Sequence, residues 1–282
     1  MAGLIRDLQA SCAHINQSAQ PVMVSGEVGC LKEQVVNYLY ITSSRSNSPL
    51  VIIDCFLLND KAWDYLLNHH NSPLAQSGCT IFLKGVDVLS AEHRRQILAN
   101  MLAMDICKRN RVVFSCVCQS GESVTEAGMA FVEHLGCLVL YLPPMRQYIS
   151  QIPAAANICL SNLNTELVKQ LLGLEPGAVQ LLQDYDWPGN HAQFQRILRE
   201  LAAMTDGLYI TRADTTQILQ RERTVPLAER KAENRSTQID FDGTLDKINQ
   251  EIICHILEEE NGNQSRTARR LGISRTTLWR LL

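Results

Sequence analysis

The chain alternates between short apolar runs and segments of helical periodicity over its first half. The run at 50–55 is apolar nearly throughout, as a strand covered on both faces is. In 31–41, apolar residues recur every three or four positions, which predicts a helix. Such alternation predicts a mostly parallel sheet with helices on both faces. The expected strands are 21–25, 50–55, 79–83, 111–118 and 137–142, and the expected helices are 31–41, 61–68 and 91–107.

The character of the sequence changes after Pro144, where the strand-like runs stop. Residues 146–220 contain no convincing strand. Helical spacing predicts helices there at 165–173, 176–185 and 190–204, with the break before the last at Trp187-Pro188-Gly189. We therefore expect an α/β domain at 1–145 and a small helical lid subdomain at 146–220.

Residues 221–240 are polar and mixed in charge, with almost no apolar pattern. This composition predicts a solvated linker between the lid and the last domain. A basic arm that touches DNA is the alternative interpretation of the same residues.

The last domain, 241–282, returns to helical periodicity. An apolar stripe predicts a longer helix at 244–260. Beyond it, Asn263 can cap a short helix, Gly272 ends that helix, and Ser274 caps a final one. Two short helices joined by a tight turn are the sequence form of a helix-turn-helix, which places its second helix in the major groove of DNA.

The net charge is unevenly divided along the chain. The whole chain carries −3, whereas residues 261–282 contain five Arg and no Asp or Glu, which leaves −8 on the remainder. An acidic remainder argues against a protein that coats nucleic acid with its whole surface. A basic hairpin that binds only protein is the alternative to DNA binding. Since Arg and short hydroxyl side chains suit phosphates and base edges, the expected DNA-binding residues are Arg266, Arg270, Ser274, Arg275, Thr276, Thr277 and Arg280.

Residues 257–282 resemble the Fis-type helix-turn-helix that closes bacterial sigma-54-dependent enhancer-binding regulators, with the propionate-catabolism regulators as the suggested branch. In that family the motif follows an AAA+ ATPase domain and a helical lid. The resemblance therefore implies a P-loop NTPase (AAA+) fold for 1–145, with the lid after it. It also implies double-stranded DNA as partner and a homodimer through 244–260, with a higher oligomer left open. Intact members contact sigma-54 RNA polymerase as well.

Residues 26–33 stand where the family has its phosphate-binding loop, after a strand and before a helix. Gly26, Gly29 and Lys32 match that motif, so the resemblance makes them the nucleotide-binding candidates. Leu31 replaces the glycine before the lysine, and its branched side chain would crowd the phosphate path. Two interpretations stay open, residual nucleotide binding through Lys32 and a relic turn.

Lys84 and Gly85 stand where the family carries Asp and Glu at the end of a strand. Those acids hold Mg²⁺ and orient the attacking water. A lysine in that place would repel a metal cation at short range. Asp87 lies too far along the chain to substitute simply.

Other parts of the family's ATPase are also changed. Residues 54–78 contain nothing like the GAFTGA loop that touches sigma-54, and the segment before Gly136 is too short to keep the arginine finger. Gln119 is the one candidate for a sensing Asn, and Ala192 replaces a sensor arginine of the lid. Phosphoryl transfer needs the metal and the arginines together. We therefore predict a pseudo-ATPase without catalytic residues and without a required cofactor, with binding of ATP and Mg²⁺ left open.

These features predict a sequence-specific DNA-binding transcriptional regulator whose AAA+ domain has lost ATP hydrolysis and sigma-54 contact. One alternative is a divergent but active ATP-dependent activator of sigma-54 promoters. Another is an AAA+-derived scaffold that binds a metabolite or a partner protein.

Ten scattered Cys, none in a CxxC pair, predict reduced and buried thiols rather than a metal site or a disulfide framework. No segment approaches the roughly 18 apolar residues of a membrane span, and the start lacks the features of a signal peptide. A cytoplasmic protein is expected. Because no sensory domain precedes the AAA+ part, we expect a short form or a fragment of the family.

Overall fold

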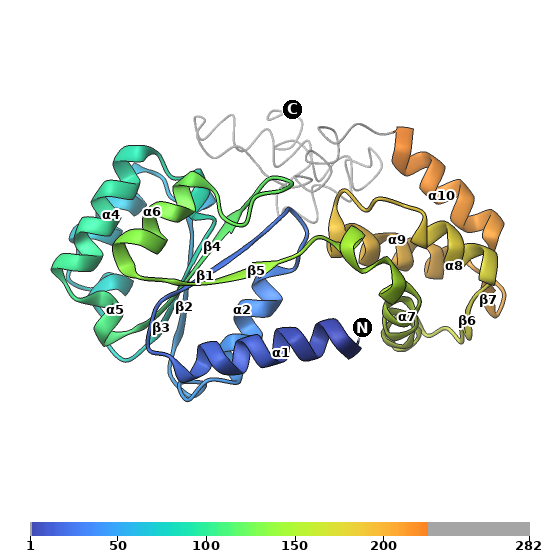
Figure 1. Cartoon of the computed structure of the whole chain (residues 1–282), viewed down its shortest axis with the longest axis horizontal. Coiled ribbons are helices and arrows are strands. Elements are labelled where there is room, and N and C mark those ends of the chain that lie inside the picture. Colours follow the sequence, from blue (N-terminus) through green and yellow to red (C-terminus); the bar gives the residue numbers. More distant parts are fainter. Residues whose placement is uncertain (1, 225–282) are drawn as a thin grey trace, which may run out of the picture. The chain divides into compact units, whose positions relative to one another are not determined.

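A five-stranded sheet, parallel throughout, forms the centre of the α/β domain (Figure 1). The computed structural model describes residues 2–224, and the chain divides into two compact units, 1–220 and 221–282. The strand order β2-β3-β4-β1-β5 places β1 between two partners, with Gly26 opposite Val117 and Leu142. The strands are β1 Val22–Gly26, β2 Leu50–Asp54, β3 Thr80–Lys84, β4 Arg111–Val117 and β5 Leu138–Leu142. The predicted parallel sheet and all five predicted strands are confirmed.

Helices cover both faces of this sheet, as the alternation predicts. One face packs against α3 Asp60–Asn68, α4 Ala91–Ala103, α5 Ile106–Arg109 and α6 Glu126–Leu135. The other face packs against α1 Ala2–Gln17 and α2 Lys32–Ile41. Short 3₁₀ turns join the elements at η1 Cys55–Leu57, η2 Pro73–Ala75 and η3 Val86–Val88.

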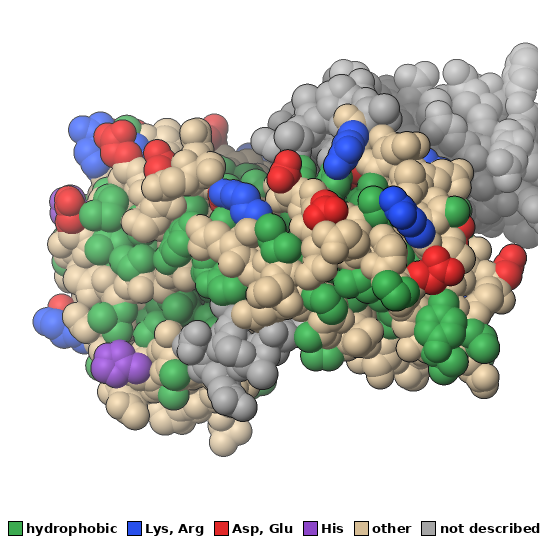
Figure 2. Space-filling view, turned by 45° about the vertical axis from the view of Figure 1, so that its right-hand side comes forward, with side chains coloured by type: hydrophobic (Ala, Val, Ile, Leu, Met, Phe, Trp, Pro, Cys, Tyr) green, Lys and Arg blue, Asp and Glu red, His purple; other side chains and the backbone are tan. Residues whose placement is uncertain are grey.

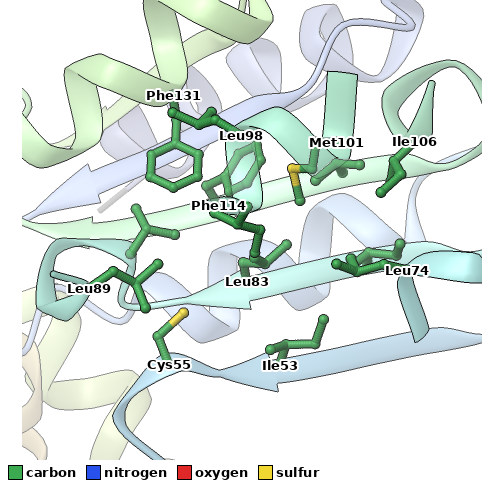
Figure 3. Close-up of a cluster of buried hydrophobic side chains, with 14 of the residues drawn as sticks. Ile53, Cys55, Leu74, Leu83, Leu89, Leu98, Met101, Ile106, Phe114 and Phe131 are labelled. Carbon is green, nitrogen blue, oxygen red and sulfur yellow. The ribbon is translucent and has the colours of Figure 1, made fainter. Parts of the chain in front are cut away.

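Adjacent residues of a strand pack into hydrophobic cores on opposite faces of the sheet. Phe114 points into the core beneath α4 and α6, where its ring centroid lies 5.0 Å from that of Phe131 (Figure 3). Val113, its neighbour in β4, belongs to the core beneath α1 and α2. This alternation follows from the two-residue period of a strand. The expectation that the strand at 50–55 is covered on both faces is wrong, because β2 lies at the edge of the sheet and leaves Ile52 60% exposed.

The predicted helix at 91–107 is confirmed as far as Ala103 and is wrong at 104–105, where it is interrupted. α4 ends at Ala103, Asp105 takes a left-handed conformation with φ 50°, and α5 begins at Ile106. A non-glycine residue in that conformation breaks the helical hydrogen-bond ladder. The apolar spacing of the sequence continues across the turn, so periodicity does not register the break.

The lid contains four α-helices, α7 Ile152–Leu167, α8 Pro176–Gln183, α9 Asn190–Met204 and α10 Arg212–Thr224, preceded by the 3₁₀ turn η4 Met145–Gln151. The predicted helix at 165–173 is wrong, since α7 begins much earlier and ends at Leu167. Asn164 exchanges hydrogen bonds with the backbone of Leu171, which stabilises the turn after α7. The expectation of no strand in 146–220 is also wrong, because β6 Gly173–Leu174 pairs with β7 Tyr209–Ile210. α10 extends to Thr224, into the range expected to be a linker.

Trp187 forms the centre of the lid core. Its side chain is fully buried, its ring meets Phe194 and Tyr185 edge-on, and its Nε1 donates to the carbonyl of Leu182. The predicted break at Trp187-Pro188-Gly189 is thus a packed turn that leads directly into α9.

All nine cysteines of the described residues are free thiols, seven of them buried. Burial raises the pKa of the Cys55 and Cys137 thiols to about 12, so both stay protonated and behave as small apolar side chains. Cys254 lies outside the described residues. Within residues 2–224, every helix is too short or too polar to cross a lipid bilayer.

Phe114→Ala tests the α/β core. We expect it to lower the free energy of unfolding by about 3–5 kcal/mol, because the fully buried ring leaves a cavity that its neighbours cannot fill. Ile158→Ala removes an exposed side chain of α7 and serves as the control. The measurement is chemical denaturation, and equal losses for the two variants would contradict this account of the core.

Candidate functional site

The phosphate-loop segment has the backbone of a strand–loop–helix. β1 ends at Gly26 and α2 begins at Lys32, with Gly29 and Leu31 in left-handed conformations at φ 79° and 54°. Glycine adopts such angles without cost, whereas a leucine there carries strain of about 1–2 kcal/mol. The chain therefore retains the turn that a glycine-containing loop would make, although Leu31 replaces the glycine.

Lys32 is turned back onto its own loop. Its Nζ donates to the carbonyls of Gly26 and Glu27, both at 2.9 Å. Burial lowers the pKa of the Lys32 ammonium. The structure thus brings the three predicted nucleotide-binding residues, Gly26, Gly29 and Lys32, into one loop, where the lysine is engaged by backbone oxygens.

The lid meets this loop at backbone distance. A Cβ placed on Gly29 would lie 2.0 Å from the carbonyl oxygen of Gly189, so only glycine fits. The backbone N–H of Ala192 donates to the Gly29 carbonyl at 3.1 Å. Ala192 therefore contacts the loop through its backbone, at the position where the family resemblance calls for an arginine side chain.

Asn190 connects the two parts of the site. Its side chain is fully buried, and its backbone is left-handed at φ 49°. Nδ2 donates to the Val28 carbonyl at 2.9 Å and to Glu27 Oε2 at 3.2 Å, while Oδ1 accepts from the Met145 N–H at 2.8 Å. One side chain thus joins the loop, the end of the α/β domain and the first turn of α9.

Arg146 adds an ion pair to the same contact. Its Nη1 and Nη2 donate to the two carboxylate oxygens of Glu27 at 2.8 and 2.5 Å, and Nη2 also donates to Ser120 Oγ. The hydrogen bonds from Arg146 are the main cause of a lowered pKa for Glu27. A two-pronged pair of this kind fixes orientation as well as charge.

Lys84, at the end of β3, forms ion pairs with two carboxylates. Its Nζ lies 3.0 Å from Glu33 Oε1 and 3.1 Å from Asp54 Oδ2. The hydrogen bond to Glu33 is the main cause of a raised pKa for Lys84. The ammonium therefore neutralises two carboxylates at the position where the resemblance implies acids that hold Mg²⁺.

Gly85, the next residue, stands where the resemblance places a catalytic Glu. It has φ 73°, and a Cβ on it would lie 2.4 Å from Phe56 Cε2. A glutamate at this position would be strained and would have to displace the ring of Phe56. Asp87 does not take over the role, because its Oδ1 accepts from the Val117 N–H at 3.0 Å and joins η3 to β4.

The remaining candidates do not converge on the loop. Gln119 is exposed, and its backbone exchanges hydrogen bonds with Glu122: its N–H donates to Glu122 Oε2, and its carbonyl accepts from the Glu122 N–H. Among the described residues, no cluster of three or more His, Cys, Asp or Glu side chains has the arrangement of a metal site. Taken with Leu31, Lys84 and Gly85, these residues do not fit a magnesium-bound nucleotide held as in the family.

The predicted DNA-binding residues lie outside the described part of the chain, as does the predicted dimerisation helix at 244–260. These residues are Arg266, Arg270, Ser274, Arg275, Thr276, Thr277 and Arg280.

Sequence reasoning missed the partners of Lys84. A signal for one of them was present, since Asp54 ends the strand next to β3 and carboxyl ends of parallel strands meet at one edge of a sheet. Glu33 gave no such signal, because its approach to Lys84 depends on how α2 packs on the sheet.

Three family models match consecutive parts of the chain. Residues 1–145 match the sigma-54 interaction domain, residues 146–232 the AAA+ ATPase lid domain, and residues 244–282 the bacterial regulatory protein Fis family. The matches together extend over nearly the whole sequence.

Similar proteins of known identity are bacterial regulators. The transcriptional regulatory protein ZraR of Escherichia coli K12 is 24% identical over 97% of this chain and 65% of its own length. The regulatory protein AtoC of the same strain is 23% identical over 96% of this chain and 64% of its own. The chain thus spans just under two thirds of these relatives.

Solved structures agree in fold. NtrX from Brucella abortus, crystallised with ATP, superposes with a TM-score of 0.63 at 20% identity, over 99% of this chain and 66% of that one. A RuvB variant from Thermotoga maritima gives 0.52 at 12% identity, over 97% and 83%. At these sequence identities, both similarities indicate a shared fold and nothing about function.

Glu27→Gln tests the ion pair that joins the loop to the lid. Because the pKa of Glu27 is lowered from its ordinary 4.5, its carboxylate stabilises the folded state above pH 4.5, and this stability is lost as the pH falls through the lowered value. We expect Glu27→Gln to cost about 1–2 kcal/mol at neutral pH, with allowance for solvent around Arg146, and less below pH 4.5.

The measurement is denaturant unfolding of both proteins across this pH range. Glu92→Gln, which removes an exposed i,i+3 pair on α4, is the control. A cost for Glu27→Gln that stays constant across the range would contradict the assigned role of the carboxylate.

Proposed function

Because the chain belongs to the family of sigma-54-dependent transcriptional regulators that end in a Fis-type helix-turn-helix, we propose that it binds specific DNA sites through that motif without hydrolysing ATP. In this proposal the AAA+ domain is a scaffold for the DNA-binding domain. The observation that carries it is Lys84, which brings an ammonium to the carboxylates at the end of β2 and the start of α2.

The electrostatics of Lys84 support the loss of hydrolysis. A magnesium ion held beside this ammonium would meet a like charge at short range, and the two acids close to it are already paired with Lys84. Transition-state charge in phosphoryl transfer is stabilised by the metal together with arginines. Ala192 supplies no such charge from the lid.

The contacts between lid and loop support a scaffold that keeps its form without nucleotide. Hydrogen bonds from Asn190 and Ala192 satisfy the carbonyls of Val28 and Gly29, and the Lys32 ammonium satisfies two more. These donors tie the loop carbonyls to groups of the protein itself. The cofactor part of the proposal is therefore that neither ATP nor Mg²⁺ is required.

The distribution of charge supports DNA binding by the last residues. Figure 2 shows acidic and basic side chains interspersed on one face of the described residues, without a continuous basic surface there. Residues 261–282 contain five arginines and no acidic residue, whereas the rest of the chain has a net charge of −8. We propose that this segment alone supplies the attraction to phosphates and that the acidic remainder limits non-specific binding.

Two copies are proposed to pair through 244–260. A two-fold dimer of helix-turn-helix motifs reads half-sites about one helical turn, roughly 34 Å, apart. Sigma-54 contact through the segment between β2 and β3 is not part of the proposal. That segment folds as η1, α3 and η2 and contains no GAFTGA-like sequence.

A divergent, working ATPase is the second candidate function. The retained strand–loop–helix with Gly26, Gly29 and Lys32 favours it. ATP hydrolysis that depends on Lys32 would distinguish it from the first candidate.

Phosphate release from ATP separates the two candidates. We expect background rates with and without DNA, and no change on Lys32→Ala, because the metal and arginine contributions are lacking. ATP hydrolysis above background that disappears in Lys32→Ala would establish the second candidate and remove the first.

Gel-shift titration against a specific site, at stated salt, tests the DNA-binding residues. We expect Arg275→Ala with Arg280→Ala to weaken specific binding by about tenfold or more, since each good base contact contributes about 1–3 kcal/mol. Arg95→Ala removes an exposed arginine of α4 and is the matched control. Equal affinity of the double variant and the control would refute the assignment.

A further inference from the structure

Three arginines gather at the edge of the sheet opposite the phosphate loop. Arg111 is the first residue of β4, Arg109 is the last residue of α5, and Arg45 lies in the segment between α2 and β2 (Figure 1). In a parallel sheet the amino ends of the strands share one edge, and the loop after β1 lies at the other. We call these three residues the arginine cluster.

Neutral oxygens are the partners of the arginine cluster. Arg111 Nη2 donates to Asn16 Oδ1 at 2.6 Å, Arg109 Nη1 to Ser77 Oγ at 3.3 Å, and Arg45 Nη1 to the Arg109 carbonyl at 3.5 Å. Among the described side chains, no Asp or Glu forms an ion pair with any of the three. The cluster thus differs from Arg146, whose guanidinium is matched by Glu27.

Several guanidinium N–H groups of the cluster are buried without an acceptor. They are Arg109 Nε, Arg109 Nη2 and Arg111 Nε. A buried donor without a partner is costly, and more so when it is charged. Arginine cannot relieve this cost by losing its proton in a protein.

The charges also act on one another. Burial, and then the neighbouring charge of Arg45, lower the pKa of Arg111. Like charges close together and half-buried repel unless a counter-charge lies between them. Orphaned donors and unbalanced positive charge at one place favour the binding of an anion there.

The surroundings are polar enough to complete such a site. Asn16 bonds Arg111 on one side, and on the other it lines a hollow of about 300 Å³ between α1 and α2, together with Thr42 and Ser44. The segment 42–48 contains four serines, and Ser77 lies beside Arg109. Hydroxyl and amide groups commonly accompany arginine around phosphates.

We propose that Arg45, Arg109 and Arg111 bind a small soluble anion that carries phosphate groups. The planar fork of a guanidinium matches phosphate oxygens two at a time, which favours phosphate over a simple halide. Three cations favour a diphosphate over a single phosphate. Because the three arginines are partly buried, a compact ligand suits them better than the backbone of a DNA duplex.

Occupancy of this site would connect elements of the α/β domain. The ligand would lie among the first residue of β4, the end of α5 and the segment after α2, and Asn16 extends the contact to α1. The site is separate from Lys32, so it does not depend on whether the phosphate loop binds nucleotide.

The experiment titrates the full-length chain with inorganic pyrophosphate at constant ionic strength, followed by isothermal calorimetry and thermal melting. We expect saturable binding and a higher melting temperature, because a ligand that binds the folded state stabilises it. Inorganic phosphate should bind more weakly. Arg45→Gln with Arg109→Gln should weaken pyrophosphate binding by about tenfold or more.

Lys108→Gln is the matched control, since this neighbour of Arg109 is exposed and pairs with Asp105, and it should bind as the unaltered chain does. Arg109→Lys keeps the charge but removes the fork, so it should bind weakly while the circular dichroism spectrum is unchanged. This variant keeps the test decisive if the double variant does not fold.

Three outcomes would overturn the proposal. One is the absence of saturable pyrophosphate binding. A second is loss of binding in Lys32→Ala with the arginine variants unaffected, which would assign the anion to the phosphate loop. The third is loss of binding in Arg275→Ala with Arg280→Ala, which would assign it to the C-terminal segment.

Discussion

The close approach of Gly29 to Gly189 is the constraint on which the arrangement of the candidate site depends. With a side chain at Gly29 the loop and the lid could not meet at backbone distance, and the hydrogen bonds from Asn190 and Ala192 would not form. The ion pair of Glu27 with Arg146 then adds charge to a contact whose geometry is already fixed by the backbone. The loop is therefore held by groups of the lid as well as by its own lysine.

The charges at the ends of β2 and β3 are also paired with one another by protein side chains. Lys84 joins the ends of β2 and β3 to the start of α2, and it does so with an ammonium rather than a metal ion. Gly85 and the ring of Phe56 take the space in which a catalytic carboxylate would have to stand. At the carboxyl ends of the strands the Lys84 ammonium is thus paired with two carboxylates. At the amino ends, guanidinium N–H groups of the arginine cluster are buried without an acceptor. The two edges of one parallel sheet differ in this respect although the same strands build both.

Much of the fold could be read from the residues. The apolar runs predicted all five strands, because strands of a sheet with helices on both faces are mostly apolar. Helix ends were predicted less well, as at Asp105 and Val168, where a left-handed residue ends a helix although the apolar spacing continues. β6 and β7 were not predicted, because strands of two residues are too short to show an alternation of apolar and polar residues. For the site, the motif predicted the strand–loop–helix that contains Gly26, Gly29 and Lys32, and the substitution at Lys84 was visible as a change of charge.

The sequence by itself determined the class of fold, the order of the parts and the residues that depart from a working ATPase, because these follow from periodicity and from residue types at motif positions. It could not determine the partners of those residues. That Lys84 reaches Glu33 and Asp54, that Asn190 spans the loop and the lid, and that Arg45 and Arg111 lie close together were decided by the tertiary structure. The physical reason is that electrostatic and hydrogen-bond partners are set by distance in space, which packing of remote segments creates and no local pattern encodes.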